Sequence, residues 1–456
     1  MKKHHSNRSM FSGKLGFVLS AAGASVGLGN IWRFPYLAAK YGGIFLLIYI
    51  LLALTFGYTM IVAETSLGRM TRKSPVGAYA SFTKSHTLKA GGWINAIIPI
   101  LIVPYYSVIG GWVIKYLFEY ICGNGTKLAE DGYFSMFISD GVSAEICFIV
   151  FALITLTIIF AGVRNGIERV SKFMMPILVV LSVIIAIYSV TRPGALKGIQ
   201  YFLVPNLENF SWMTVVSAMG QMFYSLSIAM GILVTFGSYM KKETSIEDST
   251  RNVEIFDTAI AIMAGLMIIP AVFAFSSGDP NTLQAGPSLM FITIPKVFAS
   301  MGLGTVVGIL FFVLVLFAAV TSSIALTESA VSTFEDELHW NRKKSTVVIG
   351  IIMLVLGTLS SLGYGPLDAV KILGMQFLDF FDFLTNSVMM PIAAIATCLL
   401  VSRVIGVDRI EEEMTQEGGT FRRKKIFVMM IKYLCPVFAA IILISSVMNA
   451  FGLISM

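Results

Sequence analysis

The sequence predicts an all-α protein that crosses a membrane about eleven times, and three observations support this fold class. Of the 456 residues, 56% are hydrophobic and 13% are charged, a composition outside that of soluble globular proteins. The apolar residues gather in runs that, as helices, can each cross a hydrocarbon layer of roughly 30 Å. Basic residues concentrate in every second loop between these runs.

The apolar runs define the predicted membrane spans. Their approximate cores are residues 14–36, 44–69, 94–120, 143–162, 168–190, 212–240, 255–276, 305–332, 346–362, 376–402 and 427–453. Basic residues such as Arg72, Arg164, Lys241 and Lys343 follow the second, fourth, sixth and eighth runs. By the positive-inside rule, the N-terminus is cytoplasmic and, with an odd number of spans, the C-terminus is extracellular. We expect a multi-pass protein of the inner or plasma membrane, in contact with lipid.

Two runs are interrupted at corresponding positions. Gly23, Gly27 and Gly29 each lower the stability of the first helix by roughly 1 kcal/mol relative to alanine, and Pro35 withholds a backbone donor. The sixth run carries a small-residue stretch, 225–231. These interruptions predict an inverted repeat of spans 1–5 and 6–10, with helices 1 and 6 broken at mid-membrane. The expected regions are a cytoplasmic segment, 1–11, the repeats 12–200 and 201–405, and a loop with the eleventh helix, 406–456.

The breaks also predict a binding site. Irregular backbone at membrane depth is tolerated only where it faces protein or a wet cavity, and its freed carbonyls can hold a cation. Asn30 follows the first break, Ser225 and Ser227 flank the second, and the polar stretch 321–323 interrupts the eighth run. This all-oxygen set suits a hard cation such as sodium. A single hydroxyl such as that of Thr321 more often bonds its own helix.

Among the acidic residues of the apolar runs, one in the second run and one in the seventh are singled out, because an unpaired carboxylate is costly there. Glu64, late in the second run, is expected to bind backbone donors freed by the break in the first. Asp257 is expected near the start of the seventh span. Its carboxylate is either a fixed negative charge beside the ion site or a helix N-terminal acid at the cytoplasmic edge.

Several function classes are excluded by the residue types. The net charge of +7 falls in short loops and forms no long basic face, which argues against nucleic acid. The four cysteines and four histidines have no metal-ligand spacing, so neither a metal enzyme nor an organic cofactor is expected.

The connection 277–304 is rich in glycine and proline, and is either a lid over a cavity mouth or a plain surface loop.

Several motifs occur in an order that resembles the bacterial neurotransmitter:sodium symporter family, from Arg8 to the eleventh run. They are the stretch 23–35, Glu64 with Gly68 and Arg69, and the stretches 166–169, 225–231, 321–323 and 334–338. The resemblance implies uptake of an amino acid, coupled to sodium, by alternating access. It implies no enzymatic activity.

The resemblance implies two sodium sites. The first would use the carbonyl of Ser25, the side chains of Asn30 and Ser225 and a residue of the seventh span, for which the chain offers Asp257. The second would use the carbonyls of Gly23, Val26 and Ala318 and the hydroxyls of Thr321 and Ser322. Because chloride-dependent relatives carry a neutral serine near Asp257, this carboxylate would replace chloride and make transport chloride-independent.

The resemblance also implies a substrate pocket, in which Tyr106 would hold the substrate carboxylate. Its members would be Ser25, Gly27, Gly29, Ile102, Tyr106, Tyr224, Ser225, Ser227, Ala229, Met230, Ser322 and Leu326. Amine-transporting relatives carry an aspartate at the place of Gly27, so a substrate that brings its own carboxylate is favoured here. With no acid or base in the expected side-chain region, a neutral, hydrophobic or aromatic L-amino acid is indicated.

The moving parts are assigned by the same resemblance. Arg33 and Asp382 would form the outer gate, and Arg8 with Asp336, assisted by Tyr239, the inner one. Gly166 and Pro176 would bound a segment of the fifth span that unwinds to release sodium, although a helix that simply begins after Gly166 explains the spacing as well.

Two alternatives to sodium coupling stay open. One is a transporter of the same fold driven by protons, with Asp257 or Glu64 as the carrier. The other is a membrane sensor that binds an amino acid without moving it. The residues do not select one amino acid, a number of coupled ions or an oligomeric state.

Overall fold

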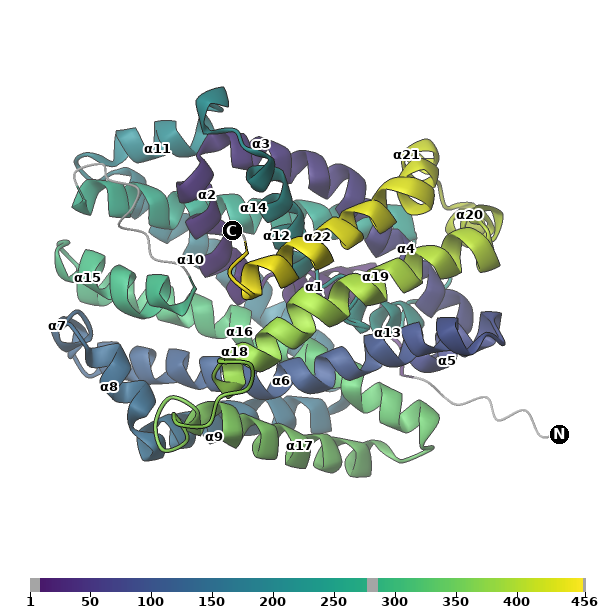
Figure 1. Ribbon diagram of the computed structural model, residues 1–456, viewed down its shortest axis with the longest axis horizontal. Helices are drawn as coiled ribbons and strands as arrows, with labels where there is room; N and C mark the ends of the chain where they lie inside the picture. The colour runs from purple at the N-terminus through teal and green to yellow at the C-terminus, as the bar shows by residue number, and fades with distance from the viewer. Residues whose placement is uncertain (1–8, 277–285, 454–456) are drawn as a thin grey trace.

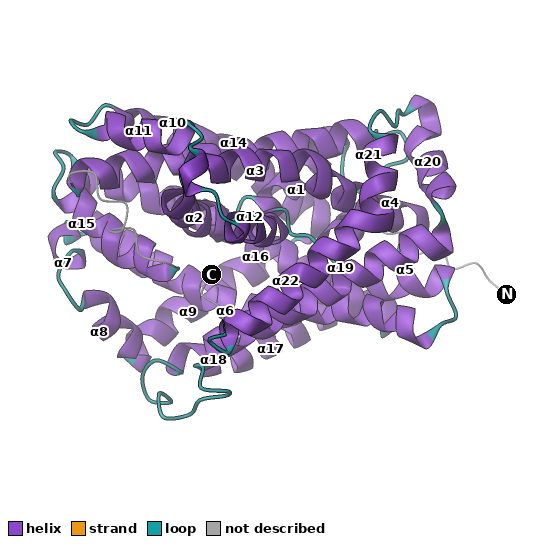
Figure 2. Ribbon diagram, turned by 45° about the horizontal axis from the view of Figure 1, so that its top comes forward, coloured by secondary structure: helices purple, strands orange, loops and turns teal. Residues whose placement is uncertain are grey.

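The computed structural model describes residues 9–276 and 286–453, and these residues form a helical bundle (Figures 1 and 2). Within these two ranges, extended pairing is limited to one isolated bridge, between Ile372 and Met375. Nine described helices are long and apolar enough to cross a membrane, and a tenth span is a bent pair, α1 and the helix that follows it. The interrupted pair α12 and α13 lies within residues 212–240, the predicted sixth span. The predicted all-α membrane fold is confirmed.

The helices of the first half follow the order expected from the apolar runs. Here η marks a π-helical or, for η4 and η9, a 3₁₀ segment. The elements are α1 (Lys14–Ser25), η1 (Gly29–Arg33), α2 (Phe34–Tyr41), α3 (Gly43–Leu52), η2 (Ala53–Gly57), α4 (Tyr58–Thr71), α5 (Pro75–Phe82), α6 (His86–Ile121), α7 (Gly125–Leu128), α8 (Tyr133–Ser139), α9 (Gly141–Phe160), η3 (Val163–Glu168), α10 (Arg169–Val190) and α11 (Ala195–Leu203).

The second half contains the other interrupted helix and ends in a terminal helix. Its elements are η4 (Leu207–Asn209), α12 (Trp212–Ser225), α13 (Ile232–Ser238), α14 (Ile246–Phe275), η6 (Leu289–Thr293), α15 (Ile294–Ala299), α16 (Gly304–Glu337), α17 (Arg342–Leu362), α18 (Phe377–Asp382), η7 (Phe383–Met389), α19 (Met390–Leu399), η8 (Leu400–Ile405), α20 (Val407–Thr415), η9 (Gln416–Gly418), α21 (Lys424–Met429), η10 (Met430–Leu434) and α22 (Cys435–Ala450).

Several spans are longer than their apolar cores. The seventh helix, α14, begins at Ile246, where the Ser245 hydroxyl accepts a hydrogen bond from the Asp248 amide. Its first turns are polar, so a hydropathy pattern does not include them. Asp257 therefore lies about three turns inside α14 and is fully buried. The alternative that Asp257 is an N-terminal acid at the membrane edge is wrong.

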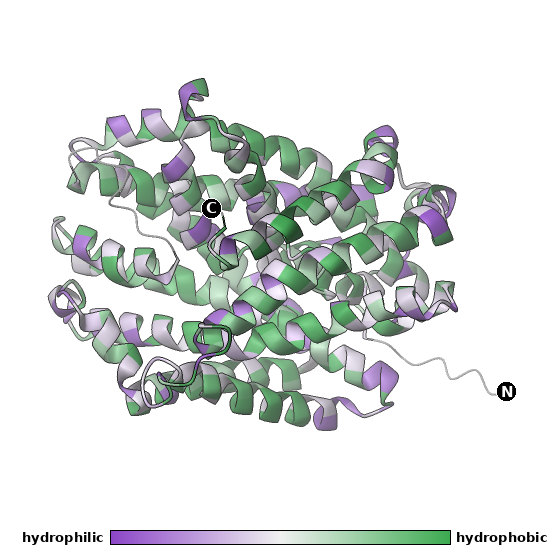
Figure 3. Ribbon diagram, in the orientation of Figure 1, coloured by the Kyte–Doolittle hydropathy of each residue, from purple (hydrophilic) through white to green (hydrophobic). Residues whose placement is uncertain are grey.

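The breaks lie at the centre of the bundle. In Figure 1, α6 runs the length of the molecule, and α1 packs between α14 and α16. Hydrophobic residues colour much of the outer ribbon in Figure 3, and outward side chains such as Leu153 and Ile184 are exposed. Exposed apolar side chains on peripheral helices are expected for a lipid-facing surface.

The two faces of the molecule carry different ends of the chain. We call the face that holds Phe11 and Tyr239 the N-terminal face. The amide of Phe11 donates to the carbonyl of Tyr239 at 3.1 Å. Asn449, near the end of α22, lines a cavity on the opposite face together with Asp382. The described ends thus lie on opposite faces, as an odd number of spans requires.

Close helix contacts depend on individual glycines. A Cβ atom on Gly68 of α4 would lie 1.9 Å from the carbonyl oxygen of Val234 in α13. One on Gly111 of α6 would lie 2.6 Å from the amide nitrogen of Phe148 in α9. Any larger residue would push these backbones apart.

The connection expected to be a lid is described in part, because residues 277–285 lie outside the described residues. The rest contains η6 and α15, packed through a bond of 2.8 Å from the Tyr116 hydroxyl to the Phe291 carbonyl. Lys296 of α15 bonds Asp131, and this hydrogen bond, with the charge of the ammonium, holds the pKa of that carboxyl below its usual value. Gly286 and Pro287 line the cavity of the opposite face. Closure of this segment over the cavity stays a prediction.

Candidate functional site

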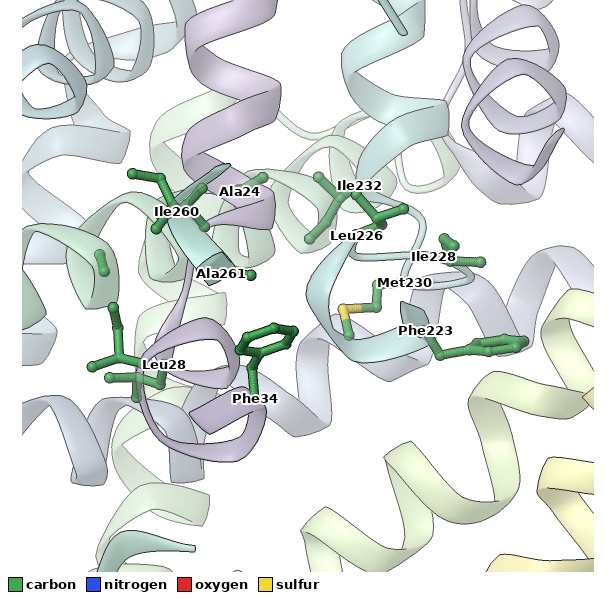
Figure 4. Close-up of a cluster of buried hydrophobic side chains, with 14 of the residues drawn as sticks. Ala24, Leu28, Phe34, Phe223, Leu226, Ile228, Met230, Ile232, Ile260 and Ala261 are labelled. Atoms are coloured by element: carbon green, nitrogen blue, oxygen red, sulfur yellow. The ribbon is translucent and has the colours of Figure 1, made fainter. Parts of the chain in front are cut away.

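The two interrupted helices meet in the middle of the bundle. The axis bends by 55° between α1 and the helix that starts at Gly29. Between α12 and α13, Ser227 and Ala229 adopt left-handed φ angles of 52° and 59°, which are uncommon for residues with a Cβ atom. Figure 4 shows a cluster of buried hydrophobic side chains to which the first interrupted helix contributes Ala24, Leu28 and Phe34 and the second contributes Met230 and Ile232.

Hydrogen bonds to α1 and α4 hold the strained backbone between α12 and α13. The hydroxyl of Ser227 donates to the carbonyl of Ala24 at 3.0 Å. The amide of Ala229 donates to Oε1 of Glu64 at 2.8 Å. Glu64 therefore binds the break in the sixth span. The expectation that it binds donors of the first break is wrong, because the packing of α4 on α13 brings Glu64 to the other break.

Asn30, Ser225 and Asp257 converge on one side of the breaks, and we call this set the first polar cluster. Asn30 Nδ2 lies 2.9 Å from Oδ1 of Asp257 and 3.1 Å from Ser225 Oγ. Ser225 Oγ donates to the same carboxylate at 2.7 Å. Tyr49 of α3, which sequence reasoning missed, donates to Oδ2 of Asp257 at 2.8 Å. Ser25 is also buried at this break, and its hydroxyl bonds the Ala21 carbonyl at 3.1 Å.

The first polar cluster has the chemistry of a cation site. Its atoms are oxygens and one amide nitrogen, and its one charged group, Asp257, is a fully buried carboxylate. Its hydrogen-bond partners in the described part of the chain are neutral: Asn30, Ser225 and Tyr49. Because a buried charge is costly without a counter-charge, these residues fit a small hard cation.

A second polar cluster joins α1 to α16. Ser322 Oγ lies 3.3 Å from the carbonyl oxygen of Gly23 and 3.5 Å from that of Val26. The Thr321 hydroxyl donates to the carbonyl of Ala318 at 3.1 Å. A Cβ on Gly23 would lie 3.1 Å from the Thr321 Cβ, so glycine permits the approach. These neutral oxygens fit a monovalent cation.

A small cavity lies between the two clusters. Its lining consists of Ala24, Ser25, Gly27, Leu28, Gly29, Asn30, Ile102, Tyr106, Tyr224, Ser227, Met230, Ser322 and Leu326. Of the expected substrate residues, Ser225 and Ala229 lie outside this lining. Ser225 turns toward Asp257, and the Ala229 amide is engaged by Glu64.

Glycines set the dimensions of this cavity. A Cβ on Gly27 would lie 2.7 Å from Ser322 Oγ and 3.2 Å from the Tyr106 hydroxyl. A Cβ on Gly29 would lie 2.3 Å from the ring of Tyr224. Tyr106 accepts a hydrogen bond from the Leu28 amide at 3.4 Å, which holds its hydroxyl beside the first break.

A larger cavity opens toward the opposite face, and both Arg33 and Asp382 line it. The Arg33 guanidinium lies 5.9 Å from the centroid of the Tyr224 ring. Asp382 instead accepts bonds from Asn386 at 2.6 Å and from Tyr105 at 3.2 Å. Tyr224 lines both cavities, so it separates them.

The N-terminal face is closed by a polar network. The Tyr239 hydroxyl donates to Glu328 at 2.7 Å, and Glu328 pairs with Arg342 at 2.5 Å. Asp336 accepts a bond from the Ser74 amide at 2.5 Å. Arg8, the expected partner of Asp336, lies outside the described residues. Sequence reasoning missed Glu328, although it is an acid inside the eighth apolar run.

The segment between Gly166 and Pro176 is helical, as η3 and the first turns of α10. A Cβ on Gly166 would lie 2.1 Å from the Ile158 carbonyl oxygen. At the end of η3, Glu168 accepts from the Ser12 amide at 2.8 Å and pairs with Lys172 at 2.6 Å. The helix thus begins before Gly166, at Val163.

Comparison with known proteins gives one consistent result. The sodium:neurotransmitter symporter family matches residues 8–126 and 135–453. The chain is similar to the uncharacterized sodium-dependent transporter YhdH of Bacillus subtilis, with 33% identity over 98% of both chains. It is 26% identical to the human sodium- and chloride-dependent GABA transporter 2, over 90% of this chain and 75% of that protein. A crystal structure of MhsT in complex with L-phenylalanine superposes with a TM-score of 0.86 and 34% identity, over 96% of this chain and 100% of that one.

Proposed function

Because the chain belongs to the sodium:neurotransmitter symporter family, we propose that it takes up a neutral, hydrophobic or aromatic L-amino acid together with sodium by alternating access. The family makes the chain a sodium-coupled membrane transporter and not an enzyme. Its substrate, its ion sites and its independence of chloride are the proposed part.

The observation that carries the proposal is the junction between the cavity and the first polar cluster. Asn30 belongs to both, so a carboxylate bound in the cavity would lie close to a cation held by Asn30, Ser225 and Asp257. A sodium ion there would favour a substrate carboxylate. Among the described residues, the cavity lining holds no acid to pair with an amine, and Gly27 leaves no room for one.

We propose two sodium ions, one at each of two sites, held without an organic cofactor. The first would be bound by the Ser25 carbonyl with Asn30, Ser225 and Asp257. The second would be bound by the carbonyls of Gly23, Val26 and Ala318 and the hydroxyls of Thr321 and Ser322. In the first site, the charge of Asp257 would make chloride unnecessary.

The side-chain preference follows from the other walls of the cavity. Ile102, Tyr106, Met230 and Leu326 are apolar or aromatic, and the described part of the chain contributes no charged side chain to the lining. The bound L-phenylalanine of the similar MhsT structure supports an aromatic or large aliphatic substrate.

The transport cycle would open the small cavity to the opposite face and to the N-terminal face in turn. With the N-terminal face cytoplasmic, this structure is open on the outside and closed on the inside. Substrate and sodium would let Arg33 and Asp382 close the outer cavity. Inward opening would part Asp336 and Tyr239 from the N-terminal segment that includes Arg8, and would unwind the helix between Gly166 and Pro176.

Uptake into proteoliposomes tests this proposal. We expect accumulation of labelled phenylalanine with a sodium gradient and no pH gradient, and competition by tyrosine, tryptophan and leucine. Equal uptake without sodium would favour the proton-driven alternative. Binding without counterflow of labelled substrate would favour the sensor.

A further inference from the structure

Glu64 is a fully buried acid that neither the sodium sites nor the gates use. It lies in the middle of α4, and its side chain is 0% exposed. Its Oε1 atom accepts one hydrogen bond, from the Ala229 amide at 2.8 Å. Its Oε2 atom is also buried and has no hydrogen-bond partner among the described residues. A carboxylate in such a place lacks donors on one of its two oxygens.

The elements around Glu64 supply no counter-charge in the described part of the chain. The break 226–231 and α13 contain no titratable residue. On α5, Tyr79 faces Glu64, but its hydroxyl bonds Thr397 at 2.7 Å. Six titratable groups on the other elements packed against α4 have partners of their own: Glu247 with Tyr58, Glu254 with Arg423, Asp257 with Asn30, Glu413 with Arg69, Lys424 with Glu411 and Cys398 with Met60.

Glu328 provides an internal comparison. It is equally buried, at 0% exposure, and also lies within a long apolar helix. Its carboxylate, however, pairs with Arg342 at 2.5 Å and accepts from Tyr239 at 2.7 Å. Burial of a carboxylate without such partners costs several kcal/mol, and the group neutralises instead.

We infer that Glu64 is a proton-binding site, occupied while the N-terminal face is closed. The carboxylic acid keeps one oxygen as the acceptor for the Ala229 amide and removes the buried charge. Any state that admits water to Glu64 releases the proton, so the proton is linked to the arrangement of the break between Ser225 and Ile232. This inference concerns a proton held beside the substrate cavity and does not replace sodium as the driving ion.

The direction of the pH dependence follows from the linkage. The neutral acid belongs to the closed conformation, so that conformation is fully favoured at low pH. This preference for the closed conformation is lost as pH rises through the titration of Glu64. Substrate affinity should then fall by about tenfold per pH unit for one coupled proton. Substrate binding needs this conformation because Ser227 and Met230 of the break line the cavity.

Infrared spectroscopy of the purified protein in nanodiscs tests the site without transport. The wild type at neutral pH should show the carbonyl stretch of a buried protonated carboxylic acid. Glu64→Gln should remove that band. The matched variant Glu328→Gln should leave it, because the Glu328 carboxylate has Arg342 as its counter-charge. A wild-type spectrum that Glu64→Gln does not change would overturn the inference, whatever the outcome for sodium coupling.

Phenylalanine binding at fixed sodium concentration gives a second measurement. Glu64→Gln keeps the acceptor for the Ala229 amide without the titration, so its affinity should stay constant over the pH range in which the wild type weakens. Glu64→Ala removes the acceptor and should bind weakly at every pH. An unchanged pH profile in Glu64→Gln would contradict the linkage, and if that variant does not bind, the infrared result alone decides.

Discussion

At Asp257, three neutral donors from three different spans meet one buried carboxylate: Asn30, Tyr49 and Ser225. The resulting negative charge requires a cation, and in the proposed function that cation is sodium. The same charge would replace an anion that a chloride-dependent site recruits from solution. The charge at this position is therefore the property to test.

Replacement of Asp257 by serine should make transport depend on chloride, because a free anion can then occupy the space of the carboxylate. Uptake of labelled phenylalanine by the variant in chloride and in gluconate checks this. Asp248→Ser is the control, since Asp248 lies on the same helix with its side chain 36% exposed. If the variant loses activity and chloride does not restore it, the idea that chloride can replace the Asp257 carboxylate is refuted.

Substitution of Gly27 tests how closely the cavity is packed around the substrate. Its missing Cβ leaves room for the hydroxyls of Ser322 and Tyr106, which a methyl group would meet at 2.7 and 3.2 Å. We expect Gly27→Ala to weaken phenylalanine binding by about 1–3 kcal/mol, the usual cost of overpacking. Scintillation proximity binding measures it. Gly13→Ala, where a Cβ meets nothing within 4 Å, should bind normally. Equal affinity in the two variants would show that Gly27 does not border the substrate.

Among the elements, the terminal helix is tied to the helix that carries Asp257. Arg423, just before α21, bonds both carboxylate oxygens of Glu254 at 3.0 and 2.7 Å. Its guanidinium also stacks over the Tyr58 ring, 3.9 Å from the centroid. Glu254 lies three residues before Asp257 on α14. The pair thus fixes α21 and α22 against the second and seventh spans.

Arg423→Gln should lower stability by about 1–3 kcal/mol, because it leaves the buried Glu254 without its counter-charge. Thermal unfolding in detergent measures this change. Lys424→Gln removes the neighbouring ion pair with Glu411, whose side chains are 42% and 37% exposed, and should change stability little. Similar unfolding temperatures for the two variants would mean that the pairing of Arg423 with Glu254 does not stabilise the bundle.

At the scale of the whole molecule, the two faces differ in access. The opposite face has a cavity that reaches Arg33, Tyr224 and Asp382, whereas the N-terminal face is closed by the network of Tyr239, Glu328 and Arg342. Alternating access predicts that substrate reduces the first opening.

Ser387→Cys, in a Cys122→Ser background, places a thiol in the lining of the outer cavity. With sodium alone, a membrane-impermeant maleimide should label it from outside in intact cells, and added phenylalanine should slow labelling severalfold. A cysteine at Ser9, which is exposed on the N-terminal face, should label only after permeabilisation. Labelling of Ser9→Cys in intact cells would reverse the proposed orientation.

The spans and the two breaks could be predicted from the sequence because they depend on local properties. A run of apolar residues is long enough to cross a bilayer wherever it packs, and glycine weakens a helix in any neighbourhood. The predicted helix ends were less accurate than the predicted spans, as at α14. Polar turns that extend a helix beyond its apolar core do not alter the hydropathy of that core. The family motifs pointed to Asn30, Ser225 and Asp257, and the fold brings these residues together.

The sequence by itself determined the fold class, the position of the breaks and the residue types around them. Only the tertiary structure decided which buried polar groups meet. Tyr49 joined Asp257, Glu64 bound the sixth span instead of the first, and Ser225 and Ala229 turned away from the cavity. These pairings depend on how each helix is rotated and how it crosses its neighbours, and packing of the complete bundle sets both.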